Sequence, residues 1–297
     1  MILQAELVLN VQAALGEGPH WDQEEGKLYW VDVEGKQLHS YDSSAHSEII
    51  YSFEKMVSAV IPSMDGGWVL AMQDGIYSFR SGHPLELLSL VESEIPGNRL
   101  NDAKCDRTGR LWFGTMSMDF SPGAGSLYVL QTDGKVQHVL SGIGCSNGIA
   151  WDDERGLMYY IDTLSRCVSA FDWHENNINV STRRTVIQIP ASSGYPDGMT
   201  IDSEGMLWVA QWGGGCVSRW NPDTGQQIAT VEVPAQYVTS CTFGGKELDE
   251  LYITTARPPM NELETLRFPL AGGLFKVKPG ATGVPANRFQ PVSHNHT

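Results

Sequence analysis

The chain has 297 residues and a formal net charge of −15, with 35 acidic residues (Asp and Glu) against 20 basic ones (Lys and Arg). Nucleic acids and anionic membranes are bound through clustered basic side chains, so this balance argues against both as partners. An apolar share of 41% is sufficient for one continuous core. The N-terminus has no basic segment followed by an apolar run, and the five cysteines lack Cys-x-x-Cys spacing. These features predict a cytoplasmic protein with reduced thiols.

In chain order, a short strand is predicted at 5–9, and six copies of one unit follow it. Each copy has a first strand that begins at an opening residue, a polar turn, and a second strand rich in aromatic residues. The second strands align on Leu28-Tyr29-Trp30, Trp68-Val69-Leu70, Leu111-Trp112-Phe113, Met158-Tyr159-Tyr160, Leu207-Trp208-Val209 and Leu251-Tyr252-Ile253. The opening residues are Glu17, Ser58, Asn101, Asn147, Asp197 and Ser240, spaced 41, 43, 46, 50 and 43 residues apart.

Four-stranded units that repeat every ~40–50 residues are typical of β-propeller blades. Six copies therefore predict an all-β, six-bladed β-propeller that forms a single domain over 1–297. The sixth copy has no clear fourth strand, so we expect the N-terminal strand to close the last blade and remove its exposed edge. A helical turn is predicted at 261–266, and an irregular tail from about 279 onward.

The turns between first and second strands are polar, and most begin with Asp and end with Gly, as in Asp106 to Gly109 and Asp202 to Gly205. Asp and Gly are both favoured in tight turns. None of these segments has the ligand spacing of an EF-hand calcium loop. We therefore interpret them as turns and not as calcium sites.

The first strand of each propeller blade lines the central channel, so the six opening residues should converge on one axis. Glu17, Asn101, Asn147 and Asp197 would place two carboxylates and two amides there. Buried carboxylates without partners are costly, which predicts either a bound cation or a hydrogen-bonded structural ring. Oxygen ligands without Cys or His favour Ca²⁺, Mg²⁺ or Mn²⁺ over zinc.

Five motifs carry a family resemblance: GEGPHW (16–21), NRLND (98–102), SNGIAW (146–151), YPDGM (195–199) and TSCTFGG (239–245). Over about residues 15–277, the chain resembles the senescence-marker-protein/gluconolactonase family of regucalcin-like sugar lactonases. The resemblance implies a six-bladed propeller that binds one divalent metal ion and hydrolyses a small sugar lactone. Ca²⁺ is favoured, with Mg²⁺, Mn²⁺, Zn²⁺ and Fe²⁺ as alternatives. The resemblance further implies that Glu17, Asn147 and Asp197 coordinate the metal and that Asp197 is the acid/base.

The resemblance also implies that Arg99 and Asn101 contact the substrate. Regucalcin-like sequences carry a glutamate pair after Gly-Thr-Met, whereas this chain has Ser117-Met118-Asp119. Asp119 is a shorter carboxylate at a position that in those members helps to hold sugar hydroxyls. Whether it contacts substrate here, and which sugar lactone is used, are left open by the sequence.

One competing motif overlaps the fourth opening residue. Gly144-Cys145-Ser146-Asn147-Gly148 fits the Gly-x-Ser-x-Gly elbow of α/β-hydrolases, which requires a strand, a sharp turn and then a helix. A β-turn follows here instead, which argues against a serine nucleophile. The remaining alternatives are a phosphotriesterase-like hydrolase, a non-catalytic calcium-binding regulator and a protein-binding propeller scaffold.

Overall fold

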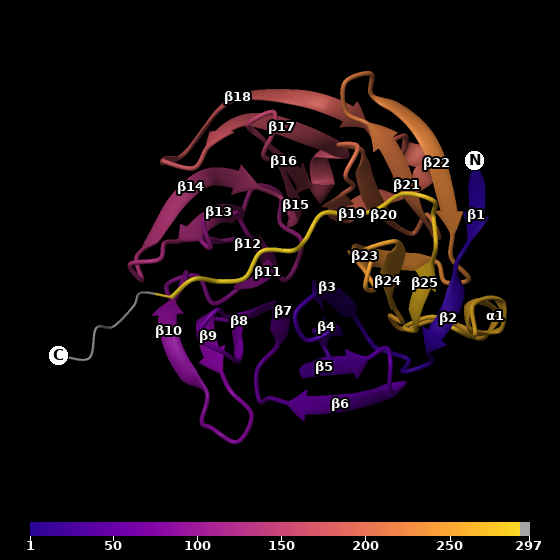
Figure 1. Cartoon of the computed structure of the whole chain (residues 1–297), viewed down its shortest axis with the longest axis horizontal. Helices are drawn as coiled ribbons and strands as arrows, with labels where there is room; N and C mark the ends of the chain where they lie inside the picture. Colours follow the sequence, from indigo (N-terminus) through magenta and orange to yellow (C-terminus); the bar gives the residue numbers. More distant parts are fainter. Residues whose placement is uncertain (292–297) are drawn as a thin grey trace.

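The structure is a computed structural model that describes residues 1–291, with the backbone alone at Asn179 and Ser181. Its strands form six four-stranded antiparallel blades arranged in a ring (Figure 1). The predicted all-β, six-bladed propeller is therefore confirmed. The two sheets of blades five and six are joined by one residue pair, Trp212 with Tyr237.

The strands of blades one to five follow sequence order from the channel outward. Blade one contains β3 (Gly16–Asp22), β4 (Lys27–Asp32), β5 (Gln37–Asp42) and β6 (Ser47–Ser52). Blade two contains β7 (Val57–Pro62), β8 (Trp68–Met72), β9 (Gly75–Phe79) and β10 (Glu86–Leu90). Blade three contains β11 (Asn98–Cys105), β12 (Leu111–Ser117), β13 (Gly125–Leu130) and β14 (Val136–Ile143).

Blade four contains β15 (Ser146–Asp152), β16 (Leu157–Asp162), β17 (Cys167–His174) and β18 (Asn177–Gln188). Blade five contains β19 (Tyr195–Ile201), β20 (Leu207–Trp212), β21 (Cys216–Asn221) and β22 (Gln226–Glu232). Blade six contains β23 (Tyr237–Gly244), β24 (Glu250–Ala256), β25 (Leu274–Val277) and β2 (Glu6–Leu9).

The N-terminal strand closes the ring as predicted, because β2 pairs antiparallel with β25 and places Leu7 opposite Phe275. A second N-terminal strand, β1 (Ile2–Gln4), was not predicted. It runs parallel to β22 and adds a fifth strand to the outside of blade five. The chain end is therefore shared between the last two blades.

The helices of the described part are short, and none is long and apolar enough to cross a membrane. Two are 3₁₀ turns, η1 (Thr163–Ser165) and η2 (Ala191–Ser193). The third is α1 (Glu262–Arg267), which confirms the helical turn predicted in the insertion. The Asn261 side chain accepts from the backbone N–H of Glu264, whose carboxylate bonds back to the Asn261 N–H. This reciprocal capping box explains where the helix begins.

The innermost strands β3, β7, β11, β15, β19 and β23 contact one another in turn, and β23 contacts β3 to complete the circle. In blades one to five the first residue of the aligned triplet pairs with the residue four positions after the opening residue, as in Ile201 with Leu207. In blade six Phe243 pairs with Leu251. The sixth opening residue is therefore Thr239, and its prediction as Ser240 was wrong by one position. Gly244 stands where most other copies have the turn Asp, so the marker that fixes the register is missing there.

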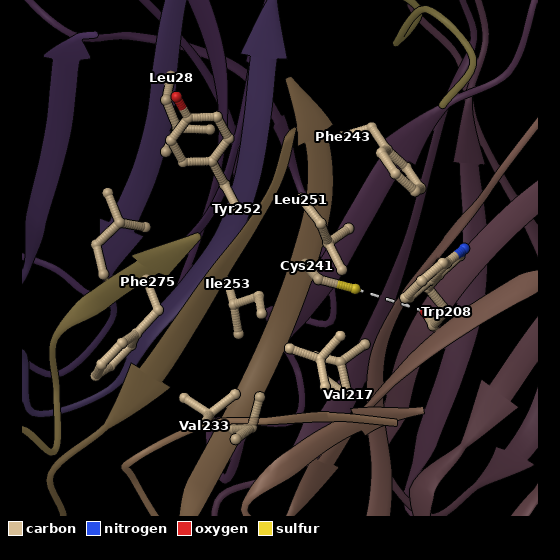
Figure 2. Packing of buried hydrophobic residues seen from close by; sticks show 14 of the residues in the cluster. Leu28, Trp208, Val217, Val233, Cys241, Phe243, Leu251, Tyr252, Ile253 and Phe275 are labelled. Atoms are coloured by element: carbon tan, nitrogen blue, oxygen red, sulfur yellow. Dashed lines mark hydrogen bonds between the residues drawn. The ribbon is translucent and has the colours of Figure 1, made fainter. Parts of the chain in front are cut away.

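Hydrophobic side chains fill the spaces between neighbouring blades. Figure 2 shows such a cluster, in which Leu28 of blade one and Trp208 of blade five lie on either side of blade six. The Cys241 thiol in this cluster donates to the Trp208 carbonyl oxygen at 3.6 Å. Large buried aromatic side chains contribute most of the stabilisation in such interfaces. This packing holds the inner strands, and hence the channel-facing residues, in fixed positions.

Residues 279–291 form no strand and cross one end of the ring (Figure 1), as predicted for an irregular tail. The tail is nevertheless anchored: Arg288 donates to both carboxylate oxygens of Asp22, at 2.6 and 2.7 Å, and Phe289 is buried beside Ser63. It covers the end of the channel at which the inner strands finish. The predicted tail residues 292–297 lie outside the described residues, so the assignment of all of 1–297 to one domain stays a prediction.

Candidate metal centre

The predicted metal ligands lie at β-bulges of the inner strands. The pairing register shifts between Glu17 and His20 in β3, between Asn147 and Ile149 in β15, and between Pro196 and Met199 in β19. Bulges bend a strand and re-aim its side chains. The side chains of Glu17, Asn147 and Asp197 are buried at the start of their strands, and the structure brings them together around the channel axis.

Glycines beside the ligands allow the inner strands to approach closely. A Cβ atom at Gly148 would lie 2.9 Å from the backbone oxygen of Asp197, and a Cβ at Gly198 would lie 2.1 Å from Ser240 Oγ. Both distances are below ordinary van der Waals contact. The Asn-Gly and Asp-Gly pairs of the two motifs therefore have a steric cause.

Asn147 supplies the observation that points most directly to a cation. Its Nδ2 donates to Thr163 Oγ1 at 2.9 Å and to Cys145 Sγ at 3.6 Å. Thr163 Oγ1 donates in turn to the Pro196 carbonyl oxygen at 2.8 Å, which fixes the orientation of the amide. The Asn147 Oδ1 is buried and has no hydrogen-bond partner in the described part of the chain. A buried amide oxygen without a hydrogen-bond partner lowers the stability of the fold, and it is a ligand type that hard cations prefer.

The two carboxylates also fit a cation. Burial raises the pKa of Glu17 to about 8, and the nearby Asp102 carboxylate adds to this shift. Burial likewise raises the pKa of Asp197 well above its ordinary value, with further contributions from Glu17 and Asp102. Within residues 1–291 no group of three His, Cys, Asp or Glu side chains could hold a metal ion without other donors. The Asn147 amide oxygen is the further donor beside Glu17 and Asp197 that would fit the predicted metal site.

The predicted substrate-binding residues Arg99 and Asn101 form a connected pair on β11. Arg99 Nη1 donates to Asn101 Oδ1 at 2.7 Å and to the Leu100 carbonyl oxygen at 2.9 Å. Asn101 Nδ2 donates to the Ser146 carbonyl oxygen at 2.7 Å. Burial lowers the pKa of the Arg99 guanidinium, and its electrostatic interactions with Cys145, Glu17 and Asp197 are among those that oppose the shift. Asn101 thus holds Arg99 beside the carboxylates.

Asp119 lies apart from this group. It is exposed on the loop after β12, where it accepts from the Ser117 hydroxyl and, at 3.0 Å, from the Ser121 backbone N–H. The hydrogen bond from Ser117 is the main reason why the pKa of Asp119 is lowered. No hydrogen bond or ion pair of the described residues joins Asp119 to Arg99 or Asn101. Its contact with substrate stays a prediction.

Asp102 was missed by the sequence reasoning. It is buried beside Asn101, where its carboxylate accepts from the Ala103 backbone N–H at 2.8 Å. Its charge acts on both Glu17 and Asp197. The signal was available, because Asp102 is the last residue of the NRLND motif, directly after an opening residue.

Ser146 does not have the setting of a nucleophile. It is fully buried, and its Oγ accepts from the Tyr160 hydroxyl at 2.7 Å. A Cβ atom at Gly114 would lie 1.7 Å from that Oγ, so the hydroxyl packs between blades three and four. Ser146 is the first residue of strand β15, whereas an elbow would require a helix after the serine. The competing serine motif is therefore fortuitous.

A comparison with protein families matches residues 15–257 to the SMP-30/Gluconolactonase/LRE-like region. The chain belongs to the SMP-30/gluconolactonase family. The matched segment runs from the start of the first blade to the end of β24 and includes Glu17, Asn147 and Asp197. The predicted family resemblance is thereby confirmed.

Individual members of the SMP-30/gluconolactonase family match almost the whole chain. The Bacillus subtilis (strain 168) protein described as "Putative sugar lactone lactonase YvrE" is 40% identical, covering 98% of each chain. Regucalcin of Danio rerio is 38% identical, again covering 98% of each chain. The solved structure of a calcium-binding protein, regucalcin, from Agrobacterium tumefaciens is 28% identical with a TM-score of 0.90, and covers 98% of each chain.

The raised pKa values predict how stability depends on pH in the metal-free protein. Glu17 binds its proton more tightly in the folded chain than in the unfolded chain. Its contribution to stability is therefore present at low pH and is lost as pH rises from about 4.5 through about 8. We expect the melting temperature of chelator-treated wild type to fall more steeply over this range than that of Glu17→Gln. Thermal unfolding across a pH series measures the difference, with Glu54→Gln as an exposed control. Parallel curves for wild type and Glu17→Gln would contradict it.

Proposed function

We propose that the chain is a metal-dependent hydrolase that opens the lactone of a sugar acid. The observation that carries this proposal is the unpartnered Oδ1 of Asn147, which lies buried beside two carboxylates whose pKa values are raised. Glu17, Asn147 and Asp197 would hold one divalent cation, with Ca²⁺ favoured because every donor is an oxygen. The YvrE and regucalcin relatives support a lactonase or a calcium-binding role.

Asp197 is assigned the acid/base role. It accepts a proton from the attacking water and later returns a proton to the ring oxygen as the ester bond breaks. Its place at the bulge of β19 leaves the carboxylate facing the channel, and burial excludes competing solvent. A divalent cation bound in the centre would polarise the lactone carbonyl and lower the pKa of a water molecule.

Arg99 is assigned to the substrate. Its guanidinium, held by Asn101, would stabilise the negative charge that develops on the carbonyl oxygen or orient the sugar hydroxyls. Asn101 already uses both ends of its amide, so its role would be to position Arg99. Asp119 would bind a sugar hydroxyl from the loop after β12. The five cysteines are all free, which supports a cytoplasmic location.

A non-catalytic calcium-binding protein is the second candidate, since the Agrobacterium tumefaciens relative is described as calcium-binding. Both candidates bind a metal, so binding alone does not separate them. The two candidates are separated by an assay of lactone hydrolysis. A panel of aldonolactones is tested with a pH indicator against protein loaded with Ca²⁺, Mg²⁺, Mn²⁺, Zn²⁺ or Fe²⁺. We expect acid release on at least one lactone with kcat in the usual enzyme range of ~1–10³ s⁻¹. Tight calcium binding without turnover of any lactone would support the second candidate.

A further inference from the structure

A cavity of about 480 Å³ lies at the opposite end of the channel from the metal centre. It is formed by the ends of the inner strands and by the turns after β15 and β19, and tail residues 284–287 lie along it. The predicted metal ligands do not line it. Its volume falls within the range of ~300–1,000 Å³ that is typical of small-molecule sites.

The innermost wall of the cavity is formed by the same inner strands, at positions three residues after the opening residues. Three residues after Glu17, Asn101, Asn147, Asp197 and Thr239 come His20, Lys104, Ala150, Thr200 and Thr242, and all five line the cavity. We call the four polar members His20, Lys104, Thr200 and Thr242 the second ring. The first positions of these strands carry mainly carboxylates and amides. In the second ring the Lys104 ammonium only donates hydrogen bonds, whereas the two Thr hydroxyls and the His20 imidazole can both donate and accept.

The side chains of the second ring are buried and largely without partners. His20, Thr200 and Thr242 are only 7%, 9% and 8% exposed. None of the three makes a side-chain hydrogen bond to another residue within 1–291. Lys104 Nζ makes one, to the Met199 carbonyl oxygen at 2.8 Å, although an ammonium group has three protons to donate. Buried polar groups are normally hydrogen-bonded, so a molecule in the cavity could complete the hydrogen bonds of this set.

The charged side chains that line the cavity indicate which chemical class of ligand it can bind. Lys104 carries the basic group of the second ring. Burial lowers the pKa of Lys104, the charge of Asp102 opposes this shift, and no ion pair joins the two side chains among the described residues. A metal cation would be repelled by Lys104, whereas a carboxylate would complete its hydrogen bonds. At the outer rim the cavity presents the exposed carboxylates of Asp153, Glu154 and Glu204 beside the guanidinium of Arg155, and Glu204 also pairs with Arg219. An occupant should therefore be anionic at its inner end and carry donors such as hydroxyl groups at its outer end.

We propose that this cavity is a second small-molecule site that binds a small hydroxycarboxylate, with its carboxylate on Lys104, Thr200 and Thr242 and its hydroxyl groups toward the acidic rim. The product of lactone hydrolysis belongs to this chemical class. The second site would then sense product at one end of the channel while turnover occurs at the other. The cavity and its donors exist whether or not the metal centre hydrolyses lactones, so the two proposals can fail separately.

Isothermal titration calorimetry of the full-length chain with gluconate tests the proposal. We expect binding with Kd near ~1 mM, and at least tenfold weaker binding of glucose, which lacks the carboxylate. Lys104→Met removes the charge and keeps the chain length, and should weaken gluconate binding by tenfold or more. Thr242→Val keeps shape and net charge, and should weaken it about fivefold, the loss expected for one hydrogen bond.

The matched control is Glu17→Gln, which alters the metal centre and should leave gluconate binding at the second ring unchanged. Thr242→Val should also keep lactone turnover within twofold of wild type. Circular dichroism shows whether each variant is folded, and Thr242→Val remains a valid test if Lys104→Met is unstable. The proposal is overturned if gluconate does not bind at ~10 mM, if glucose binds equally well, or if Thr242→Val binds as wild type does. It is also overturned if Glu17→Gln abolishes binding, since the carboxylate would then occupy the metal centre.

Discussion

Removing divalent cations with a chelator is expected to abolish lactone hydrolysis and to lower the melting temperature. Without the cation, the Asn147 oxygen has no partner, and Glu17 and Asp197 are buried without the positive charge that would stabilise their ionised forms. A ligand that binds only the folded state stabilises it by about 2.7 kcal/mol at one hundred times Kd. For a chain of this length that corresponds to roughly 5 °C. Turnover and thermal unfolding, measured before and after chelation and after re-addition of metal, check both effects.

Glu17→Gln provides the graded version of this experiment. It keeps one oxygen donor and removes a negative charge, so we expect weaker metal binding and activity that partly recovers at high metal concentration. An exposed carboxylate such as Glu262, changed to Gln, should alter neither property. Full turnover in protein shown by elemental analysis to be metal-free would exclude the proposed mechanism.

Asp197→Asn is expected to lower kcat at saturating metal by at least about 10²-fold, the low end for general acid–base catalysis. The amide retains one oxygen for the cation, so metal should still bind, although more weakly. It cannot take the proton of the attacking water, and this is the step that we assign to Asp197. Steady-state kinetics across a metal titration separate the two effects, because a lost ligand is compensated by excess metal and a lost base is not.

Asp197→Ala should lose both metal binding and turnover, and it sets the lower limit for the comparison. Asp102 is the other buried carboxylate near the centre, and Asp102→Asn tests whether it could serve as the base instead. If excess metal restores Asp197→Asn to near wild-type turnover, Asp197 acts only as a ligand. A large kcat loss in Asp102→Asn alone would then assign the base to Asp102.

The fold was predictable because each blade repeats the same local pattern. The aromatic triplets and Asp turns fix strand positions without knowledge of tertiary contacts, and Leu207 pairs with Ile201 as expected. Two features were not predictable. A three-residue strand such as β1 carries too little periodicity to be recognised, and it forms because the edge of β22 is available. The anchoring of the tail depends on the pairing of Arg288 with Asp22, which are 266 residues apart.

The residue types at the candidate metal centre were also predictable, but the hydrogen bonds that these side chains make or lack were not. Convergence of Glu17 and Asp197 follows from the repeat, because equivalent positions of a propeller meet at its axis. The unpartnered Oδ1 of Asn147 depends on the tertiary contact of its Nδ2 with Thr163, which no spacing rule encodes. The second ring repeats the first at a constant offset, and that offset can be read in the sequence once the first ring is known.

The pairing of β2 with β25 has a consequence for synthesis on the ribosome. The strand Glu6–Leu9 emerges from the ribosome long before its partner Leu274–Val277. Until then the nascent chain is an open arc with unpaired strand edges, which are prone to aggregate. Glu17 of blade one and Asp197 of blade five take up their places around one axis only when the arc becomes a circle. The capacity to hold the cation should therefore arise in a single late step, and a chain truncated before β25 should lack it entirely.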